Sequence, residues 1–314
     1  MFNITQDLTL IKSDCLPVLK SIPTSSIDAI ITDPPYFRVK ENSWDRQWKT
    51  AEDFFSWLEI ILIEFKRILK PTGSLYLFCG PYLAAQTETL INRHFNVLNH
   101  IYWVKRTGRH LGCHIPSLRK YFPQTESIIF AESMTHPTDK QFCCEPIRQY
   151  LADEWLSAGL RFSDAEKAVG SVARHYFSRS QWSLPTYEKY NQLKERAGNG
   201  FFLKSWADLK SILDNAERGE RCTRRYFSAE KGCYTDVWNF EVVRSYKGKH
   251  PCEKPVQLME RIIKTSTRPG DLILDAFLGS GSTAKAALAT GRRVIGIDAD
   301  DTWFDEVRQT VNSV

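Results

Sequence analysis

The sequence predicts an α/β protein whose mostly parallel sheet is covered by helices on both faces and interrupted by a mainly helical insert. Two observations predict this fold. Short strand-like apolar runs alternate with segments of helical periodicity over residues 1–131, and the same alternation returns over residues 246–314. Residues 132–245 are instead polar, rich in Arg, Ser and Tyr, and poor in β-branched runs. We therefore expect the two ends of the chain to build one sheet, with residues 132–245 as a separate helical segment.

The elements of the first part follow from its periodicity. The segment 51–70 repeats apolar residues at helical spacing and stops at Pro71, which cannot continue a helix. A second helix is expected over residues 82–93. Short apolar runs predict strands at residues 7–12, 27–32, 73–79, 95–104 and 126–131.

The remaining elements are expected in the insert and the last part. In the segment 147–197 the pattern predicts four short helices, with Gly159 and Gly170 ending the first two and Pro185 beginning the fourth. The last part predicts a helix at 255–265, a strand at 271–277, a glycine-rich turn, a helix, a strand at 292–298 and a final helix.

Composition and charge restrict the class of protein. With 42% apolar and 25% charged residues, the 314-residue chain can bury a globular core. The net charge of +5 is compatible with a nucleic-acid partner without requiring one. No apolar run approaches the roughly 18 residues of a membrane-spanning helix, and the first residues lack the pattern of a secretion signal. We therefore expect a cytoplasmic protein with no membrane partner.

Cysteine usage points away from disulfides and metals. The eight cysteines fall at irregular spacings without a C-x-x-C pair, which indicates reduced thiols. The densest cluster of metal-ligating residue types is His110, Cys113 and His114. A zinc pattern needs a matching second half, which the sequence lacks, so we expect no metal site.

A glycine-rich turn near the C-terminus indicates a nucleotide-like cofactor. In LILDAFLGSGSTAKAALATGRRVIGID, Gly279 and Gly281 allow close approach of a ligand, and the following helix offers free N–H groups. Asp298 ends the next strand, where a carboxylate can accept both hydroxyls of a ribose. The pattern also fits G-x-G-x-x-A, so a nicotinamide enzyme and a purely structural turn both remain open at this point.

The tetrapeptide Asp33-Pro34-Pro35-Tyr36 follows a predicted strand, and open α/β sheets bind ligands where their strands end. Two prolines fix the backbone and remove two N–H donors, which leaves the carbonyl of Pro34 as an acceptor. A carboxylate, a carbonyl and an aromatic ring suit a planar group that carries an NH2. Hydrogen bonds from that amine would free its lone pair and stabilise the positive charge that develops when it attacks an electrophile. A proline-stiffened loop with a capping Asp is the structural alternative.

These motifs resemble those of the β-type amino-methylating DNA methyltransferases. The resemblance rests on DPPY, on HPCEKPVQLMERII at 250–263 and on DAFLGSGSTA, in the permuted order in which the catalytic motif precedes the cofactor motif. It covers both α/β parts and implies a Rossmann-like sheet, S-adenosylmethionine as cofactor and methyl transfer to an exocyclic amine. Ala276 replaces a usual proline, and Ser282-Thr283 replaces a usual pair of threonines.

The resemblance also assigns residues. The catalytic motif would be Asp33, Pro34, Pro35 and Tyr36. Asp14 corresponds to the acidic position near the adenine of the cofactor, and Asp298 to the position that binds its ribose. The cofactor-binding residues that the resemblance implies are Asp14, Cys15, His250, Lys254, Pro255, Asp275, Phe277, Gly279, Gly281, Ser282, Thr283 and Asp298.

The target base has two candidates. In the family that the sequence resembles, DPPY occurs mostly in enzymes that methylate adenine N6, whereas cytosine-N4 enzymes more often begin the motif with serine. We therefore expect adenine N6, with cytosine N4 as the alternative. Pro251-Cys252 mimics the nucleophile of cytosine-C5 enzymes but lies inside the His-Pro…Lys-Pro motif, so we expect no role for it. A DNA-binding regulator on a degenerate fold is a further alternative, disfavoured because both motifs are intact.

Double-stranded DNA is the expected substrate, with the target base flipped out of the helix. Segment 37–50 interleaves basic residues with Trp44 and Trp48, which suggests either a loop over the base or a packed surface loop. The insert resembles a helix-turn-helix, with residues 172–177 as the segment that would enter the major groove. The expected DNA-binding residues are Arg38, Lys40, Lys105, Arg106, Arg109, Arg119, Lys120, Ser171, Arg174, His175, Arg179, Ser180 and Gln181.

The resemblance suggests two further partners. Members of the family often dimerise, so a homodimer is one expectation. A restriction endonuclease with the same target would be encoded separately.

Overall fold

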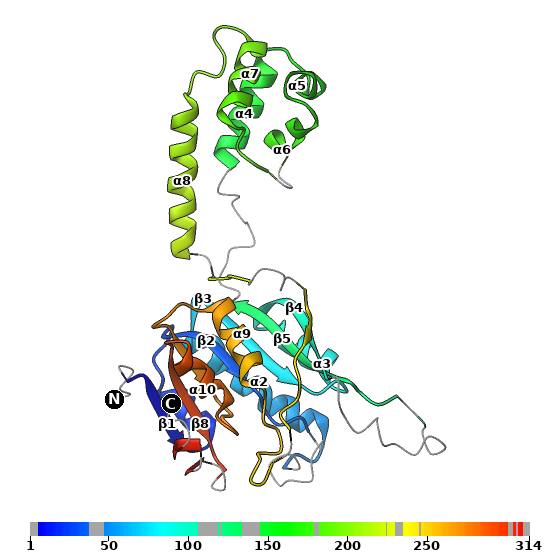
Figure 1. Cartoon of the computed structure of the whole chain (residues 1–314), viewed down its shortest axis with the longest axis vertical. Coiled ribbons are helices and arrows are strands. Elements are labelled where there is room, and N and C mark those ends of the chain that lie inside the picture. The colour runs from blue at the N-terminus through cyan, green and yellow to red at the C-terminus, as the bar shows by residue number, and fades with distance from the viewer. Residues whose placement is uncertain are drawn as a thin grey trace. The chain divides into compact units, whose positions relative to one another are not determined.

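The computed structural model (Figure 1) describes residues 6–37, 47–105, 119, 121–133, 145–178, 182–223, 225–229, 235–244, 246–300, 304–305 and 307–309. Its contacts divide the chain into two compact units. One unit, the α/β unit, consists of Met1–Thr135 and Arg225–Val314. The other, the helical unit, is His136–Arg224.

Within the described residues, the α/β unit contains an eight-stranded sheet in the order β1-β8-β7-β2-β3-β5-β4-β6. From β1 to β3 all neighbours are parallel, whereas β5 runs antiparallel to both β3 and β4. The strands are β1 (Leu8–Lys12), β2 (Ile27–Thr32), β3 (Leu69–Cys79), β4 (Phe95–Val104), β5 (Thr125–Ser133), β6 (Val237–Asn239), β7 (Leu272–Asp275) and β8 (Arg293–Asp298). The predicted α/β fold with a mostly parallel sheet is confirmed.

Helices cover both faces of this sheet, as Figure 1 shows. The first face carries α1 (Cys15–Ser21), α2 (Ala51–Ile68) and α3 (Ala84–Ile91), and the second carries α9 (Val256–Ser266) and α10 (Ser282–Ala289). Successive side chains of a strand point to opposite faces, so Ile30 belongs to the first core cluster, and Ala29 and Ile31 to the second. A strand buried on both faces explains why IDAIIT is apolar almost throughout.

The parallel strands end at a common edge. Because β2 pairs with β7 and β7 with β8 in the same direction, their carboxyl ends meet there. Asp33 follows β2, Asp275 ends β7 and Asp298 ends β8. Three carboxylates that are far apart in sequence therefore come to one edge of the sheet.

The antiparallel strands bring two more charged residues to this edge. Because β5 runs opposite to β3, the beginning of β5 lies beside the end of β3, with Ser127 opposite Cys79. In turn β4 runs opposite to β5, with Trp103 opposite Glu126. Glu126 near the start of β5 and Lys105 just after β4 thus lie at the same edge as the carboxyl ends of the parallel strands.

Some element bounds differ from those predicted. Helix α2 ends at Ile68, three residues before Pro71, because Leu69 already has extended backbone and begins β3. The strand predicted over 271–277 ends at Asp275, whose Oδ1 accepts a hydrogen bond from the N–H of Phe277 at 3.1 Å and so turns the chain. Of the predicted final helix, residues 304–305 and 307–309 are helical, and the rest lies outside the described residues.

The predicted insert, 132–245, was too wide at both ends. Residues 132–133 complete β5, and β6 at Val237–Asn239 pairs in parallel with the end of β4. Residues 237–239 belong to the sheet because Trp238 is buried in its second core cluster. A single strand of three residues gives no sign of this burial in the sequence. The contacts place Arg225 and the residues after it with the α/β unit.

The helical unit has its own core. Its elements are α4 (Glu145–Ser157), α5 (Phe162–Val169), the 3-10 turn η4 (Ser171–Ala173), α6 (Arg174–Phe177), α7 (Tyr187–Ala197) and α8 (Trp206–Thr223). Trp155, Tyr190 and Phe202 are buried at its centre. Gly170 ends α5 with a φ of 83°, a conformation that glycine adopts without strain. The segment expected to enter a major groove consists of η4 and the single turn α6, with Tyr176 and Phe177 buried in the core.

Among the described residues, none of the helices combines the length and the apolar character that crossing a membrane would require.

Candidate active site

The corner after β2 holds a carboxylate and a phenol in direct contact. The Tyr36 hydroxyl donates a hydrogen bond of 2.5 Å to Oδ1 of Asp33. The ring of Tyr36 packs against Gly80, where an added Cβ would lie 3.3 Å from the ring. A glycine at the end of β3 therefore leaves the space that Tyr36 occupies.

Asp33 belongs to a buried chain of alternating charges. The Lys254 ammonium contacts Oδ2 of Asp33 and lies 3.6 Å from Oε2 of Glu126. Lys105 Nζ donates to Oε1 of Glu126 at 2.6 Å. The side chain of Lys254 is only 7% exposed, so its charge is stabilised by these carboxylates instead of by water. The four groups, Asp33, Lys254, Glu126 and Lys105, form what we call the charge chain.

Mutual interactions set the protonation of the charge chain. Burial raises the pKa of Asp33, Lys254 lowers it and Glu126 raises it. Burial acts to lower the pKa of Lys254, but the charges of Asp33 and Glu126 outweigh this effect. The pKa is therefore raised overall, and the ammonium stays charged. Burial also acts to raise the pKa of Glu126, and Lys254 and Lys105 together hold it below its usual value. Lys254 therefore favours the charged form of both carboxyl groups, against the effect of burial.

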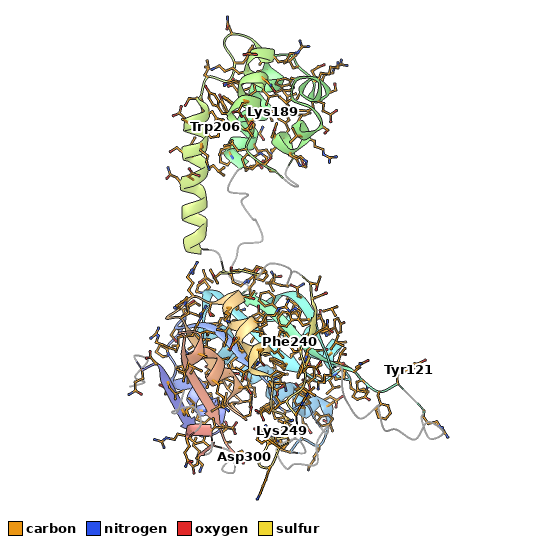
Figure 2. The ribbon with its side chains drawn as sticks, viewed as in Figure 1. Tyr121, Lys189, Trp206, Phe240, Lys249 and Asp300 are labelled. Atoms are coloured by element: carbon orange, nitrogen blue, oxygen red, sulfur yellow. The ribbon has the colours of Figure 1, made fainter. Side chains whose placement is uncertain are left out.

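A large cavity opens at this edge of the sheet. Its volume is about 1190 Å³, and its walls come from the ends of β1, β2, β4, β7 and β8 and from the segment before α9. Lys249 and Asp300, two of its wall residues, lie at the same end of the α/β unit in Figure 2. Asp33 and Asp298 both line the cavity, so one ligand there can reach both.

The glycine turn forms one wall. Gly279 has a φ of 50°, and an added Cβ would lie 3.2 Å from Cε1 of His250. Its N–H donates to Oδ2 of Asp298 at 2.6 Å, and the N–H of Asp300 donates to Oδ1 at 2.9 Å. These bonds fix the carboxylate of Asp298, and each oxygen keeps a lone pair for another donor.

The walls fit an adenosine-type cofactor that carries a positive charge. Asp298 supplies a fixed acceptor for sugar hydroxyls, and the bare backbone at Gly279 allows close approach. Trp57 of α2 and Phe277 form an aromatic wall with ring centroids 5.7 Å apart. Asp14 and Asp300 add negative charge to the cavity.

Most residues expected to bind the cofactor line the cavity, namely Asp14, Cys15, His250, Lys254, Asp275, Phe277, Gly279, Ser282, Thr283 and Asp298. Pro255 and Gly281 are not part of its wall. Pro255 caps α9, and Gly281 caps α10 with a φ of 72°. Lys254 lines the cavity, and its ammonium contacts Asp33.

Two of the expected residues have mainly structural contacts. Asp14 caps α1 by accepting the N–H of Leu16 at 2.9 Å. Asp275 is 3% exposed and accepts the Thr32 hydroxyl at 3.0 Å, which joins β7 to β2. Burial raises the pKa of Asp275 to about 7.

Only some of the residues expected to contact DNA lie in the described part of the chain. The Lys105 ammonium donates to Glu126, and a contact of Lys105 with DNA stays a prediction. Arg119, Ser171 and Arg174 are exposed, and His175 is half-buried. The others lie outside the described residues, namely Arg38, Lys40, Arg106, Arg109, Lys120, Arg179, Ser180 and Gln181. The cluster of His110, Cys113 and His114 also lies outside them.

Glu126 and Trp57 are among the cavity-wall residues that sequence reasoning missed. The available signal for Glu126 was a carboxylate at the start of an otherwise apolar strand. Trp57 on α2 packs against Trp48, which precedes the helix, with ring centroids 4.6 Å apart. Trp48 is 8% exposed and also packs edge-on against Phe54. For Trp48 this favours the packed-loop interpretation of segment 37–50, while Trp44 lies outside the described residues.

A family model described as DNA methylase, covering N6 and N4 methyltransferases, matches residues 27–309. The chain is 25% identical to the type II methyltransferase M.HinfI of Haemophilus influenzae, over 98% of this chain and 68% of that protein. It is 27% identical to the DNA adenine methyltransferase YhdJ of Escherichia coli K12, over 94% of this chain and 80% of that protein.

Solved structures show the same fold. The complex of M1.HpyAVI with SAM has a TM-score of 0.53 at 18% identity and covers 97% of this chain and 100% of its own. The cytosine-N4-specific PvuII DNA methyltransferase has a TM-score of 0.54 at 13% identity, covering 98% and 92%. The shared fold therefore extends over nearly the whole of each chain.

Proposed function

Because this chain belongs to the DNA methylase family, we propose that it methylates adenine at N6 in double-stranded DNA, with S-adenosylmethionine as the methyl donor. One observation carries the proposal. Asp33, at the end of β2, lines the same cavity as Gly279 and Asp298, so an amine acceptor and a nucleoside site share one space.

When bound, S-adenosylmethionine supplies a methyl group on a positively charged sulfur, which an amine can attack directly. The residues that would hold it are Asp298 at the ribose, Gly279 and Phe277 beside the methionine part, and Trp57 as an aromatic wall. The carboxylates of Asp14, Asp298 and Asp300 favour a cationic ligand in the cavity.

Asp33 and the backbone carbonyl of Pro34 act on the amine of the target base. An exocyclic amine is a poor nucleophile because its lone pair is delocalised into the ring. Hydrogen bonds from its two N–H groups to these acceptors free the lone pair. Asp33 also stabilises the positive charge that develops on nitrogen. No covalent bond forms between enzyme and base. Tyr36 supplies an aromatic face at the corner, worth about 1–3 kcal/mol if a base stacks on it.

Adenine is favoured over cytosine by two arguments. The corner begins with aspartate rather than serine, and the relative YhdJ is described as an adenine methyltransferase. Cytosine N4 is the second candidate, because the family model covers both amines and PvuII has the same fold. A DNA-binding regulator has no use for an intact Asp33 corner beside an intact glycine turn.

The target amine inside a duplex is paired and stacked, so the base must be flipped into the cavity. We assign sequence recognition to the helical unit, whose Arg174 and Ser171 are exposed on α6 and η4. The proposal places the protein in the cytoplasm with DNA, as a homodimer. It includes a cognate restriction endonuclease, since the relative M.HinfI is a type II methyltransferase.

The test is methylation of mixed-sequence DNA by the purified protein with tritiated S-adenosylmethionine, followed by digestion and chromatography of the nucleosides. Label in N6-methyldeoxyadenosine is the expected result. Label in N4-methyldeoxycytidine would overturn the base assignment alone, and DNA without label would overturn the proposed activity.

A further inference from the structure

Each oxygen of Asp33 already accepts one hydrogen bond from the protein itself. Tyr36 donates to Oδ1, and the Lys254 ammonium contacts Oδ2. An amine that reaches the corner needs an acceptor there, and an ammonium is a stronger donor than a neutral amine. While Lys254 holds Oδ2, it competes with the amine for Asp33, so Asp33 becomes a stronger acceptor for the base when Lys254 loosens this contact.

Glu126 offers Lys254 a second position. Its Oε1 is held by Lys105 at 2.6 Å, so the carboxylate is fixed from the far side. Its Oε2 is buried, has no hydrogen-bond partner among the described residues, and lies 3.6 Å from Lys254 Nζ. A movement of the ammonium by about 1 Å would give that pair the length of an ordinary charged hydrogen bond.

We propose that Glu126 is a positioning residue that receives the ammonium of Lys254 when the target amine binds, which releases Asp33 to accept that amine. The inference rests on the proposed function, since it needs an amine at Asp33. Two carboxylates face two ammonium groups before and after the shift, so the charge chain stays neutral throughout. No proton is transferred in this step, and only hydrogen-bond partners change.

The location of Lys254 supports a short, guided movement. Its Nζ lies 5.6 Å from the centroid of the Tyr36 ring and 5.3 Å from that of Phe78, so aromatic faces flank the ammonium. Its backbone is fixed nearby, because the Ser282 hydroxyl donates to the carbonyl of Lys254 at 2.8 Å. The flexible side chain can therefore change partner while its backbone stays in place.

The alternative is that Lys254 stays on Asp33 and Glu126 only compensates its charge. The two possibilities differ in what removal of the Glu126 charge does to amine recognition. Glu132 provides a matched control on the same strand, because its side chain is 16% exposed against 15% for Glu126 and pairs with Arg225 at 3.2 Å. It does not line the cavity.

The experiment compares Glu126→Gln with Glu132→Gln in the full chain. The first readout is kcat and KM on a duplex that contains the mapped target. The second is equilibrium binding, with sinefungin as unreactive cofactor analogue, of two duplexes that carry adenine or purine at the target position. Purine lacks the amine, so the ratio of the two affinities reports the contact of the amine with Asp33.

For Glu126→Gln we expect kcat to fall about 10- to 100-fold with KM for S-adenosylmethionine within about twofold, the range lost with one hydrogen bond to a charged group. The preference for adenine over purine should fall towards one. Glu132→Gln should keep kcat and the preference for adenine within about twofold of wild type. Glu126→Asp keeps the charge, so it should recover part of the kcat and part of the preference that Glu126→Gln loses.

A Glu126→Gln enzyme with unchanged kcat and unchanged adenine preference would overturn the inference while the wild-type activity upholds the proposed function. A wild-type protein that labels no DNA would overturn both. If Glu126→Gln fails to fold, Glu126→Asp compared with Glu132→Asp decides, since only the former should lower kcat and adenine preference.

Discussion

The Lys254 ammonium contacts the carboxylate of Asp33 although the two residues are 221 positions apart in the chain. The contact joins the segment before α9 to the corner after β2 in the wall of the cavity. It therefore couples the half of the sheet that carries the proposed chemistry to the half that carries the cofactor turn.

Asp33→Ala should abolish methyl transfer while the cofactor still binds. The carboxylate is the principal acceptor for the amine, and loss of such a group costs about 10²- to 10⁴-fold in rate. Single-turnover transfer from tritiated S-adenosylmethionine measures the loss, and calorimetry measures cofactor affinity. Joint loss of cofactor binding and of the folded state would show that the corner is a structural loop.

Gly279→Ala should weaken cofactor binding about tenfold or more. Its φ of 50° disfavours any side chain, and its new Cβ would lie 3.2 Å from the ring of His250. Gly159→Ala is the control, because its φ of 73° is similarly strained but nothing lies within 4 Å of the added Cβ. Cofactor affinity lowered equally by both changes would mean that the effect comes from general destabilisation.

Lys254→Met should lower the free energy of unfolding by about 3–5 kcal/mol, because it leaves Asp33 and Glu126 buried without a cation between them. Lys264→Met removes an ammonium that is 43% exposed and pairs with Glu260 on the same helix, which should cost only about 0.5 kcal/mol. Urea denaturation at pH 7 measures both. Equal effects would show that the buried pair has no special role in stability.

Asp275→Asn should change the dependence of stability on pH. In the wild type burial raises the pKa of this carboxyl to about 7, so the protonated form stabilises the fold below pH 4. That contribution is lost as pH rises from about 4 to about 7, by at most about 4 kcal/mol for three pKa units. The variant should therefore be more stable relative to wild type at pH 8 than at pH 5, as urea denaturation measures. A constant difference would show that Asp275 does not titrate in this range.

The pair Arg174→Ala and Arg179→Ala, made together, should weaken DNA binding across sequences without changing cofactor affinity. Two lost phosphate contacts should reduce the slope of log affinity against log salt by about 2. Lys194→Ala with Arg196→Ala removes the same charge from exposed positions on α7. Unchanged affinity, or an equal loss in the control, would contradict a recognition role for the segment around α6.

Local patterns predicted much of the fold and part of the candidate site. The bounds of β2 and β4 agree with those expected to the residue, because an apolar run between breakers fixes both ends of a strand. The Asp33 corner and the glycine turn were found because each is a short contiguous motif. The width of the insert was misjudged because Trp238 shows its burial only when β6 pairs with β4.

The sequence by itself determined the α/β class, the position of the Asp33 corner and the glycine turn, since adjacent residues specify each of them. Only the tertiary structure decided what faces Asp33. Strand direction is a property of the assembled sheet, and because β5 runs antiparallel to β3, its first residues lie at the edge where the parallel strands end. That reversal brings Glu126 to Lys254, and Lys254 to Asp33, across separations for which the sequence contains no local signal.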